Sequence, residues 1–219
     1  MTELAVHFLD AAATRAARGS RSEAASAINL LEWLTVSIAQ DRAAARFSQW
    51  GRSTVVDENV GKPVLAQAAF EYLHELAGVE ASWPIGNAGV LHCYGYLLSR
   101  VSTPYGLKRE RWLGADLAQA YDLGGDAFIP WRGQGTLLER AAGAASALLR
   151  SPAASRSLTL DGRESRVALT AATGPAALAY AVASNPGEEP RLVTTFPVAD
   201  AAAILEEFDA EPRLRWNAL

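Results

Sequence analysis

The chain has 219 residues, of which 50% are hydrophobic and 20% are charged, and its formal net charge is −4 at pH 7. This composition is typical of a folded globular protein and excludes a mainly disordered chain. The acidic balance argues against binding to nucleic acid or to an anionic membrane surface, and the single cysteine, Cys93, excludes an internal disulfide.

Targeting and cofactor signals do not occur in the sequence. No apolar run reaches the roughly 20 residues that cross a bilayer, and residues 1–10 lack the basic and apolar regions of a secretory signal. Motifs for nucleotides, zinc hydrolases or paired metal-binding cysteines are absent. A three-histidine metal site is not expected, because His7 and His74 fall on terminal or solvent-facing helices. We therefore expect a soluble cytoplasmic protein without a metal or a cofactor.

Two helices are expected in the first 50 residues. Residues 2–17 carry apolar side chains at helical spacing and are followed by a glycine, a common helix stop. Ser20 or Ser22 caps the next helix, which runs to Trp50. Apolar side chains cover most of its surface, so we expect it to lie in the core.

A third helix is expected to begin at Lys62 and Pro63, because proline suits the first helical position. It ends at Gly78. Its polar side includes His74, so we expect this histidine to be a solvated surface residue.

Residues 90–101 fit either a strand or a helix. A strand would be apolar on both faces and would need burial on both sides. A helix would carry apolar side chains at i, i+4, i+7 and i+8, with Asn87 available as its cap. We favour the helix. Gly95 in its interior costs about 1 kcal/mol relative to alanine, which indicates either that another segment packs closely there or that the helix assignment is wrong.

The rest of the chain changes from helical to strand periodicity. After a break at Pro104, helices are expected from Glu110 to Leu123 and from Thr136 to Arg150. From Ser155 onward apolar side chains alternate, and an Asp-Gly pair predicts a hairpin turn. The elements expected after Ser155 are strands on both sides of Asp161 and Gly162, strands at Leu178–Val182 and Leu192–Val198, a helix from Asp200 and an edge strand at Leu214–Trp216.

These elements predict an α+β protein in which a mainly helical N-terminal part packs against a small C-terminal antiparallel sheet with one helix. The expected boundary separates a helical domain of residues 1–152 from a small α+β domain of residues 153–219. We expect the two parts to pack together as one globular unit.

The segment after Val90 contains the first group of candidate site residues. On a helix, His92, Tyr96 and Ser99 project to the same side. A neutral imidazole beside a phenol can relay protons near neutral pH, so His92 and Tyr96 are the candidate catalytic residues. The alternative is a core histidine with satisfied ring nitrogens. Cys93 is expected to be inert packing unless a cation lowers its pKa.

The second candidate group is a basic segment that begins at Arg100. Four cations and one anion within 13 residues are suited to holding a carboxylate or a phosphate. Cations in the first turn of a helix oppose its dipole, which favours a bound anion there. The alternative is a solvated loop with local salt bridges. The candidate substrate-binding residues are Tyr105, Lys108, Arg109, Arg111 and Trp112.

Trp83, Trp112 and Trp131 lie in or beside expected loops. Tryptophan in a loop lines a pocket or fills the gap between the loop and the core, and the sequence does not distinguish these roles.

Two functional hypotheses follow. The first is a soluble small-molecule enzyme or binding protein for an anionic ligand, with acid–base chemistry at His92 and an arginine clamp at Arg109 and Arg111. The alternative is a non-catalytic interaction protein or immunity-type adaptor that presents an acidic surface to a basic partner. A nucleic-acid partner is not expected, nor is a membrane. A protein partner or a homo-oligomer is compatible with either hypothesis.

Overall fold

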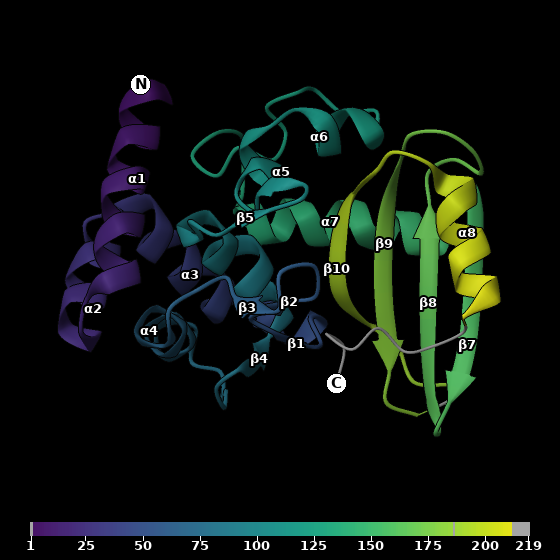
Figure 1. The fold of residues 1–219 in the computed structure, drawn as a ribbon, viewed down its shortest axis with the longest axis horizontal. Coiled ribbons are helices and arrows are strands. Elements are labelled where there is room, and N and C mark those ends of the chain that lie inside the picture. Colours follow the sequence, from purple (N-terminus) through teal and green to yellow (C-terminus); the bar gives the residue numbers. More distant parts are fainter. Residues whose placement is uncertain (1, 186, 212–219) are drawn as a thin grey trace.

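The computed structural model describes residues 2–185 and 187–211 and has the expected α+β architecture (Figure 1). Helices of the N-terminal part form one side of the molecule, and a four-stranded antiparallel sheet forms the other. The predicted fold class is confirmed. Within the described residues, no helix combines the length and the apolar character that crossing a membrane requires.

The first predicted helix is confirmed as α1 (Thr2–Arg18). Ser20 caps α2 (Arg21–Asn29) through a capping box with Glu23. The single helix expected up to Trp50 is wrong, because the chain breaks after α2 and continues as α3 (Glu32–Ala43) and a 3₁₀ turn (Arg46–Gln49). The break lets α2 pack on α1 while α3 packs on other helices.

The third helix begins later than expected. It is α4 (Gln67–Ala77), and Gly78 ends it in the left-handed conformation as predicted. Lys62 and Pro63 instead form the short strand β3 (Lys62–Pro63), which pairs with β2 (Val56–Asp57). Proline favours the first position of a helix, but here the pairing of β2 with β3 places Pro63 in a strand.

Residues 88–98, which we call the central helix, confirm the helical prediction with an irregular geometry. Val90–Gly95 form a π-helical turn and Tyr96–Leu98 form a 3₁₀ turn. The Asn87 side chain accepts a hydrogen bond from the Val90 amide at 3.2 Å, as expected of a cap. A Cβ atom at Gly95 would lie 3.1 Å from Leu65, so the expected close packing is present.

The helix predicted from Glu110 to Leu123 is divided into α5 (Glu110–Leu113) and α6 (Asp116–Ala120). The break lies at Gly114, which has an extended backbone and whose Cβ, if present, would lie 2.8 Å from the Glu110 carbonyl. A short hairpin of β5 (Ser102–Thr103) and β6 (Gly106–Leu107) precedes α5. The next predicted helix is confirmed as α7 (Leu137–Arg150), capped by Thr136.

The C-terminal sheet has the strand order β10-β9-β8-β7, and all neighbours are antiparallel. The predicted turn at Asp161 and Gly162 is confirmed, and both residues have positive φ, as a type I′ hairpin requires. The predicted helix after Asp200 is also confirmed. The edge strand expected at Leu214–Trp216 lies outside the described residues. The elements of this part are β7 (Ala154–Leu160), β8 (Arg163–Leu169), β9 (Ala176–Ala183), β10 (Arg191–Val198) and α8 (Ala201–Ala210).

The sheet contacts helices on two sides and is joined to the N-terminal part at β10 (Figure 1). Helix α7 crosses one face and contacts β8, β9 and β10, while α8 contacts β7. The amide of Gly51 donates a hydrogen bond of 2.9 Å to the carbonyl of Leu192. Gly51 immediately precedes β1 (Arg52–Thr54), which pairs with β4 (Ile85–Asn87) next to the central helix.

Replacing glycine with alanine is expected to have opposite effects on stability at two glycines in helical segments. A Cβ at Gly89 would lie 2.7 Å from Leu138 and 2.8 Å from Trp50, whereas a Cβ at Gly143 in α7 would meet nothing within 4 Å. Gly89→Ala is expected to reduce the free energy of unfolding by about 1–3 kcal/mol through overpacking. Gly143→Ala is expected to raise it by about 1 kcal/mol. Urea unfolding measures both, and equal effects would contradict the packing described here.

Candidate functional site

The Tyr96 ring brings together several of the residues predicted to form a site. The His92 ring lies 4.8 Å from it, centroid to centroid. The Arg111 guanidinium lies over the Tyr96 ring at 5.1 Å, and the Lys108 ammonium lies over it at 5.5 Å. We call this group, with the direct polar partners of its members, the Tyr96 cluster: Ser53, Asp57, His92, Tyr96, Lys108, Arg111 and Thr194.

His92 is held inside the protein by the central helix. Its Nε2 atom lies 3.0 Å from the Ser53 hydroxyl on β1, and its carbonyl accepts a hydrogen bond of 2.6 Å from the Trp112 indole. Burial, with repulsion from Arg111 and Lys108, holds the pKa of His92 well below its usual value of 6.5. The ring is therefore neutral at pH 7. The ring also interacts with the main chain of Val193, which opposes the lowering of its pKa, although Nδ1 has no hydrogen-bond partner of standard geometry among the described residues.

Arg111 lies between the central helix and β10. Its guanidinium lies 5.4 Å from the Phe196 ring centre, in addition to its contact with Tyr96. Its Nη1 atom donates a hydrogen bond of 3.0 Å to Thr194, which follows a bulge in β10. The side chain is partly buried, and loss of hydration lowers the pKa of the guanidinium. Within the described part of the chain, Arg111 forms no ion pair with a carboxylate.

Lys108, in contrast, has a carboxylate partner. It forms an ion pair with Asp57, and both side chains are largely covered. Burial disfavours charge on Asp57, but the hydrogen bond and the charge of Lys108 outweigh it, so the pKa of Asp57 is lowered. Burial raises the pKa of Tyr96 to about 12 although Arg111 opposes this, so the phenol is neutral at pH 7.

The structure places three of the other candidates away from the Tyr96 cluster. Arg109 forms an ion pair with Asp10 of α1, so the expected clamp of Arg109 with Arg111 is not formed. Tyr105 is 81% exposed in the turn between β5 and β6. Ser99 lies beyond the central helix, where its hydroxyl accepts a hydrogen bond from the Val101 amide. Of these three, Arg109 is directed by a contact with a distant part of the chain.

Buried aromatic and thiol groups near the cluster act as packing. Trp112 is fully buried and contacts the Phe128 ring at 6.0 Å, so it fills the core beneath α5. Trp83 is only partly buried and packs edge-on against the Phe70 ring, with the ring centres 5.3 Å apart. Cys93 is fully buried, and burial raises the pKa of its thiol well above 9.0, which is the behaviour of an inert cysteine.

The two hollows identified on the surface lie elsewhere. One, of about 560 Å³, is lined by residues of α7 and neighbouring loops, including Tyr121, Leu148 and Thr170. The other, of about 670 Å³, lies between α3 and α4 and is lined by residues that include Arg42 and Glu75. Neither is lined by a member of the Tyr96 cluster. Arg111 and Lys108 are the partly exposed cations of the cluster, so a ligand is expected to approach it on their side.

His74 corrects a sequence prediction. It is only 3% exposed, and its Nδ1 atom donates a hydrogen bond of 2.8 Å to the Phe70 carbonyl. Its Nε2 atom accepts a hydrogen bond of 3.0 Å from the Asn87 amide. The missing side chain of Gly86 leaves room for the ring against β4. The polar residues near His74 on the same helix hid the fact that its ring joins α4 to β4. Burial lowers the pKa of His74 below 6.5.

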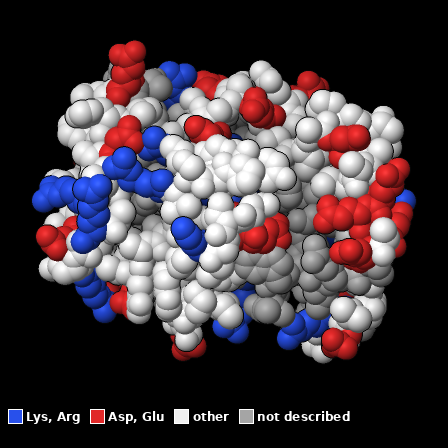
Figure 2. All heavy atoms as spheres, in the orientation of Figure 1, with Lys and Arg blue, Asp and Glu red and all other residues white. Residues whose placement is uncertain are grey.

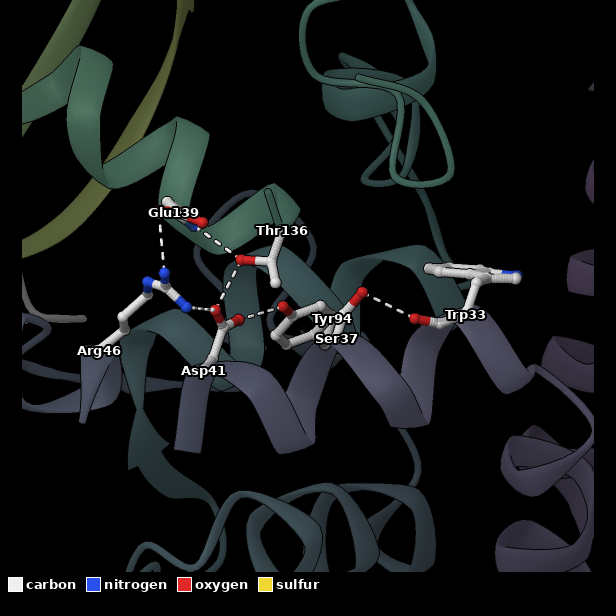
Figure 3. Close-up of polar contacts among 7 residues, drawn as sticks. All are labelled: Trp33, Ser37, Asp41, Arg46, Tyr94, Thr136 and Glu139. Atoms are coloured by element: carbon white, nitrogen blue, oxygen red, sulfur yellow. Dashed lines mark hydrogen bonds and ion pairs between the residues drawn. The ribbon is translucent and has the colours of Figure 1, made fainter. Parts of the chain in front are cut away.

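A buried carboxylate, Asp41, was missed by the sequence analysis (Figure 3). It accepts hydrogen bonds from the Tyr94 hydroxyl, from Thr136 at 2.6 Å and from Arg46 at 3.2 Å. Burial raises the pKa of Asp41, although these three partners oppose the increase. The missed signal was its position seven residues after Leu34 on the buried stripe of α3. Asp41 joins α3, the central helix and the start of α7.

Because His74 and His92 are buried, we predict that the free energy of unfolding falls as the pH is lowered. Each has a folded-state pKa below its unfolded value of about 6.5, so the unfolded state binds more protons as pH falls. Their contribution is complete above about pH 6.5 and decreases as pH falls toward the folded-state pKa values. Urea unfolding between about pH 8 and about pH 5 is expected to show this loss. His74→Gln is expected to reduce the slope, and the exposed His7→Gln is the control; a flat profile for the wild type would contradict this account.

Asp41→Ala is expected to lower the free energy of unfolding by about 3–5 kcal/mol, because Arg46 and two hydroxyl groups lose their buried acceptor. Asp10→Ala, which removes a half-exposed carboxylate, is the matched control with an expected loss within about 1 kcal/mol. Chemical unfolding of the two variants measures the difference. Similar losses would show that the Asp41 contacts do not support the fold.

Neither a metal-binding group in the described residues nor a known relative indicates a function for the Tyr96 cluster. Among residues 2–185 and 187–211, no three His, Cys, Asp or Glu side chains are grouped in a way that could hold a metal ion. The sequence matches no protein-family model, no curated protein and no solved structure at a significant level. Its function must therefore be inferred from the chemistry of its own side chains.

Proposed function

We propose that the protein binds a small anionic molecule, a carboxylate or a phosphate, at Arg111. The observation that supports this proposal is a partly buried guanidinium that no carboxylate of the described residues neutralises. A charged group that loses water needs a compensating partner. An anion bound through charge-assisted hydrogen bonds supplies one, and the guanidinium can hold it through two N–H groups.

Other arginines of the protein provide the contrast. Arg46 pairs with Asp41 and Glu139, and Arg109 pairs with Asp10. The side chain of Arg156 is 41% exposed and still pairs with a carboxylate, that of Asp209. Arg111 instead contacts aromatic rings and one hydroxyl group. Its surroundings are therefore suited to a cation that receives its counter-charge from a ligand.

The enzymatic form of this proposal assigns proton transfer to His92. Its imidazole is neutral, and its interaction with the Val193 main chain does not hold Nδ1 in a hydrogen bond of standard geometry. A neutral ring of this kind can accept a proton in general acid–base catalysis. Tyr96 lies against both His92 and Arg111, so its phenol is placed to orient a ligand held by Arg111.

A second candidate function is a protein-interaction module with an acidic surface. Figure 2 shows acidic side chains gathered over α8, where Glu206, Glu207 and Asp209 are exposed. Such a surface attracts a basic partner and weakens with added salt. For this function, Glu206→Gln would reduce binding of a lysine-rich peptide, and Arg111→Gln would leave it unchanged.

Arg111→Gln is expected to reduce affinity for a small carboxylate such as benzoate by at least about tenfold, because a charged hydrogen-bonding partner is lost. It is expected to preserve or raise the melting temperature, since it also removes an uncompensated cation. Arg109→Gln is the matched control. It is expected to keep ligand affinity and to lose at most about 1 kcal/mol of stability.

Isothermal titration calorimetry and thermal unfolding measure these two properties. Equal ligand binding by the wild type and Arg111→Gln would contradict the proposal. The proposal would also be contradicted if the wild type bound none of the four anions benzoate, acetate, phosphate and sulfate.

A further inference from the structure

We propose that the Arg111 site takes a singly charged carboxylate in preference to a phosphate or sulfate dianion, and that Asp57 sets this preference. The inference rests on the proposed function and adds the charge class of the ligand. It makes Asp57 a specificity-determining residue, although this side chain binds Lys108 rather than the ligand.

Within the Tyr96 cluster, one of the two cations has no carboxylate partner. Lys108 and Arg111 both lie over the Tyr96 ring, but Asp57 neutralises Lys108. His92 and Tyr96 are neutral because both are buried. A ligand with one negative charge therefore balances Arg111, whereas a dianion leaves an excess negative charge in a partly desolvated place.

Asp57 in the cluster and Glu58 beside it increase the penalty for a second negative charge. The charge of Asp57 reaches Arg111, where it supports the cationic form against the effect of burial. Asp57 and Glu58 both disfavour ionisation of the Tyr96 phenol, after the larger effect of burial. Their field at the cluster therefore repels additional negative charge.

The geometry of Arg111 also fits a carboxylate. The guanidinium lies over the rings of Tyr96, Phe196 and Trp112, at 5.1, 5.4 and 5.9 Å. One Nη1 donor is used by Thr194. The other N–H groups remain for a planar acceptor that approaches along the edge of the guanidinium, as in bidentate arginine–carboxylate pairs.

The test is a calorimetric titration of the full chain with four probes at about pH 8, where phosphate is mainly a dianion. Benzoate and acetate are the monoanions, and inorganic phosphate and sulfate are the dianions. The wild type is expected to bind at least one monoanion about tenfold more tightly than either dianion. Asp57→Asn, which frees the charge of Lys108, is expected to strengthen dianion binding about tenfold and to change monoanion binding much less.

Two further variants keep the experiment decisive. The double variant Asp57→Asn with Lys108→Gln has the same net charge as the wild type, so it is expected to restore the preference for monoanions. It also removes the unpaired lysine and so provides a test if Asp57→Asn alone does not fold. Asp10→Asn changes a carboxylate outside the cluster and is expected to leave the preference unchanged.

Each outcome has one meaning. Tighter dianion than monoanion binding by the wild type would overturn the charge preference, while the proposed anion site would stand. An unchanged preference in a folded Asp57→Asn variant, or a dianion preference in the double variant, would overturn the role of Asp57. If the wild type binds none of the four probes, the proposed function itself fails.

Discussion

Complete burial of the central helix is the constraint on which the rest of the structure depends. Every residue of Val90–Gly95 is buried, so its polar groups need partners within the protein. Asn87 satisfies the start of the helix, Tyr94 bonds to Asp41, and Trp112 bonds to the His92 carbonyl. These contacts join α3 and α5 to the centre of the molecule, and Thr136 at the start of α7 bonds to the same Asp41. The same enclosure keeps His92 neutral.

The fold was largely predictable because its main elements follow local rules. Alternating apolar residues and the Asp161–Gly162 turn were sufficient for the hairpin of β7 and β8, and Ser20 marked the start of α2. The breaks at Leu31 and Gly114 were not predicted. Each is a local departure of the backbone from helical geometry, at Leu31 and at the extended Gly114, and the period of apolar side chains does not reveal such departures.

The site was only partly predictable, for a related reason. The sequence identified His92, Tyr96, Lys108 and Arg111 by their chemistry, and these side chains meet at one ring. It could not tell which of Arg109 and Arg111 would lie at the Tyr96 ring, because Asp10 and Thr194, both distant in the sequence, set the directions of the two side chains. His74 and Asp41 show the opposite error: polar residues on helices are buried when a donor on another segment supplies a hydrogen bond to them.

The central functional claim is that the Arg111 guanidinium is the contact point for an anion. Nuclear magnetic resonance with observation of the arginine side-chain Nε–H groups and of the histidine and tyrosine ring signals tests it directly during a titration with benzoate. The account predicts a saturable shift of the Arg111 signal, with smaller shifts at His92 and Tyr96 and none at Arg109. A saturating titration in which the Arg111 signal stays fixed while other signals move would contradict it.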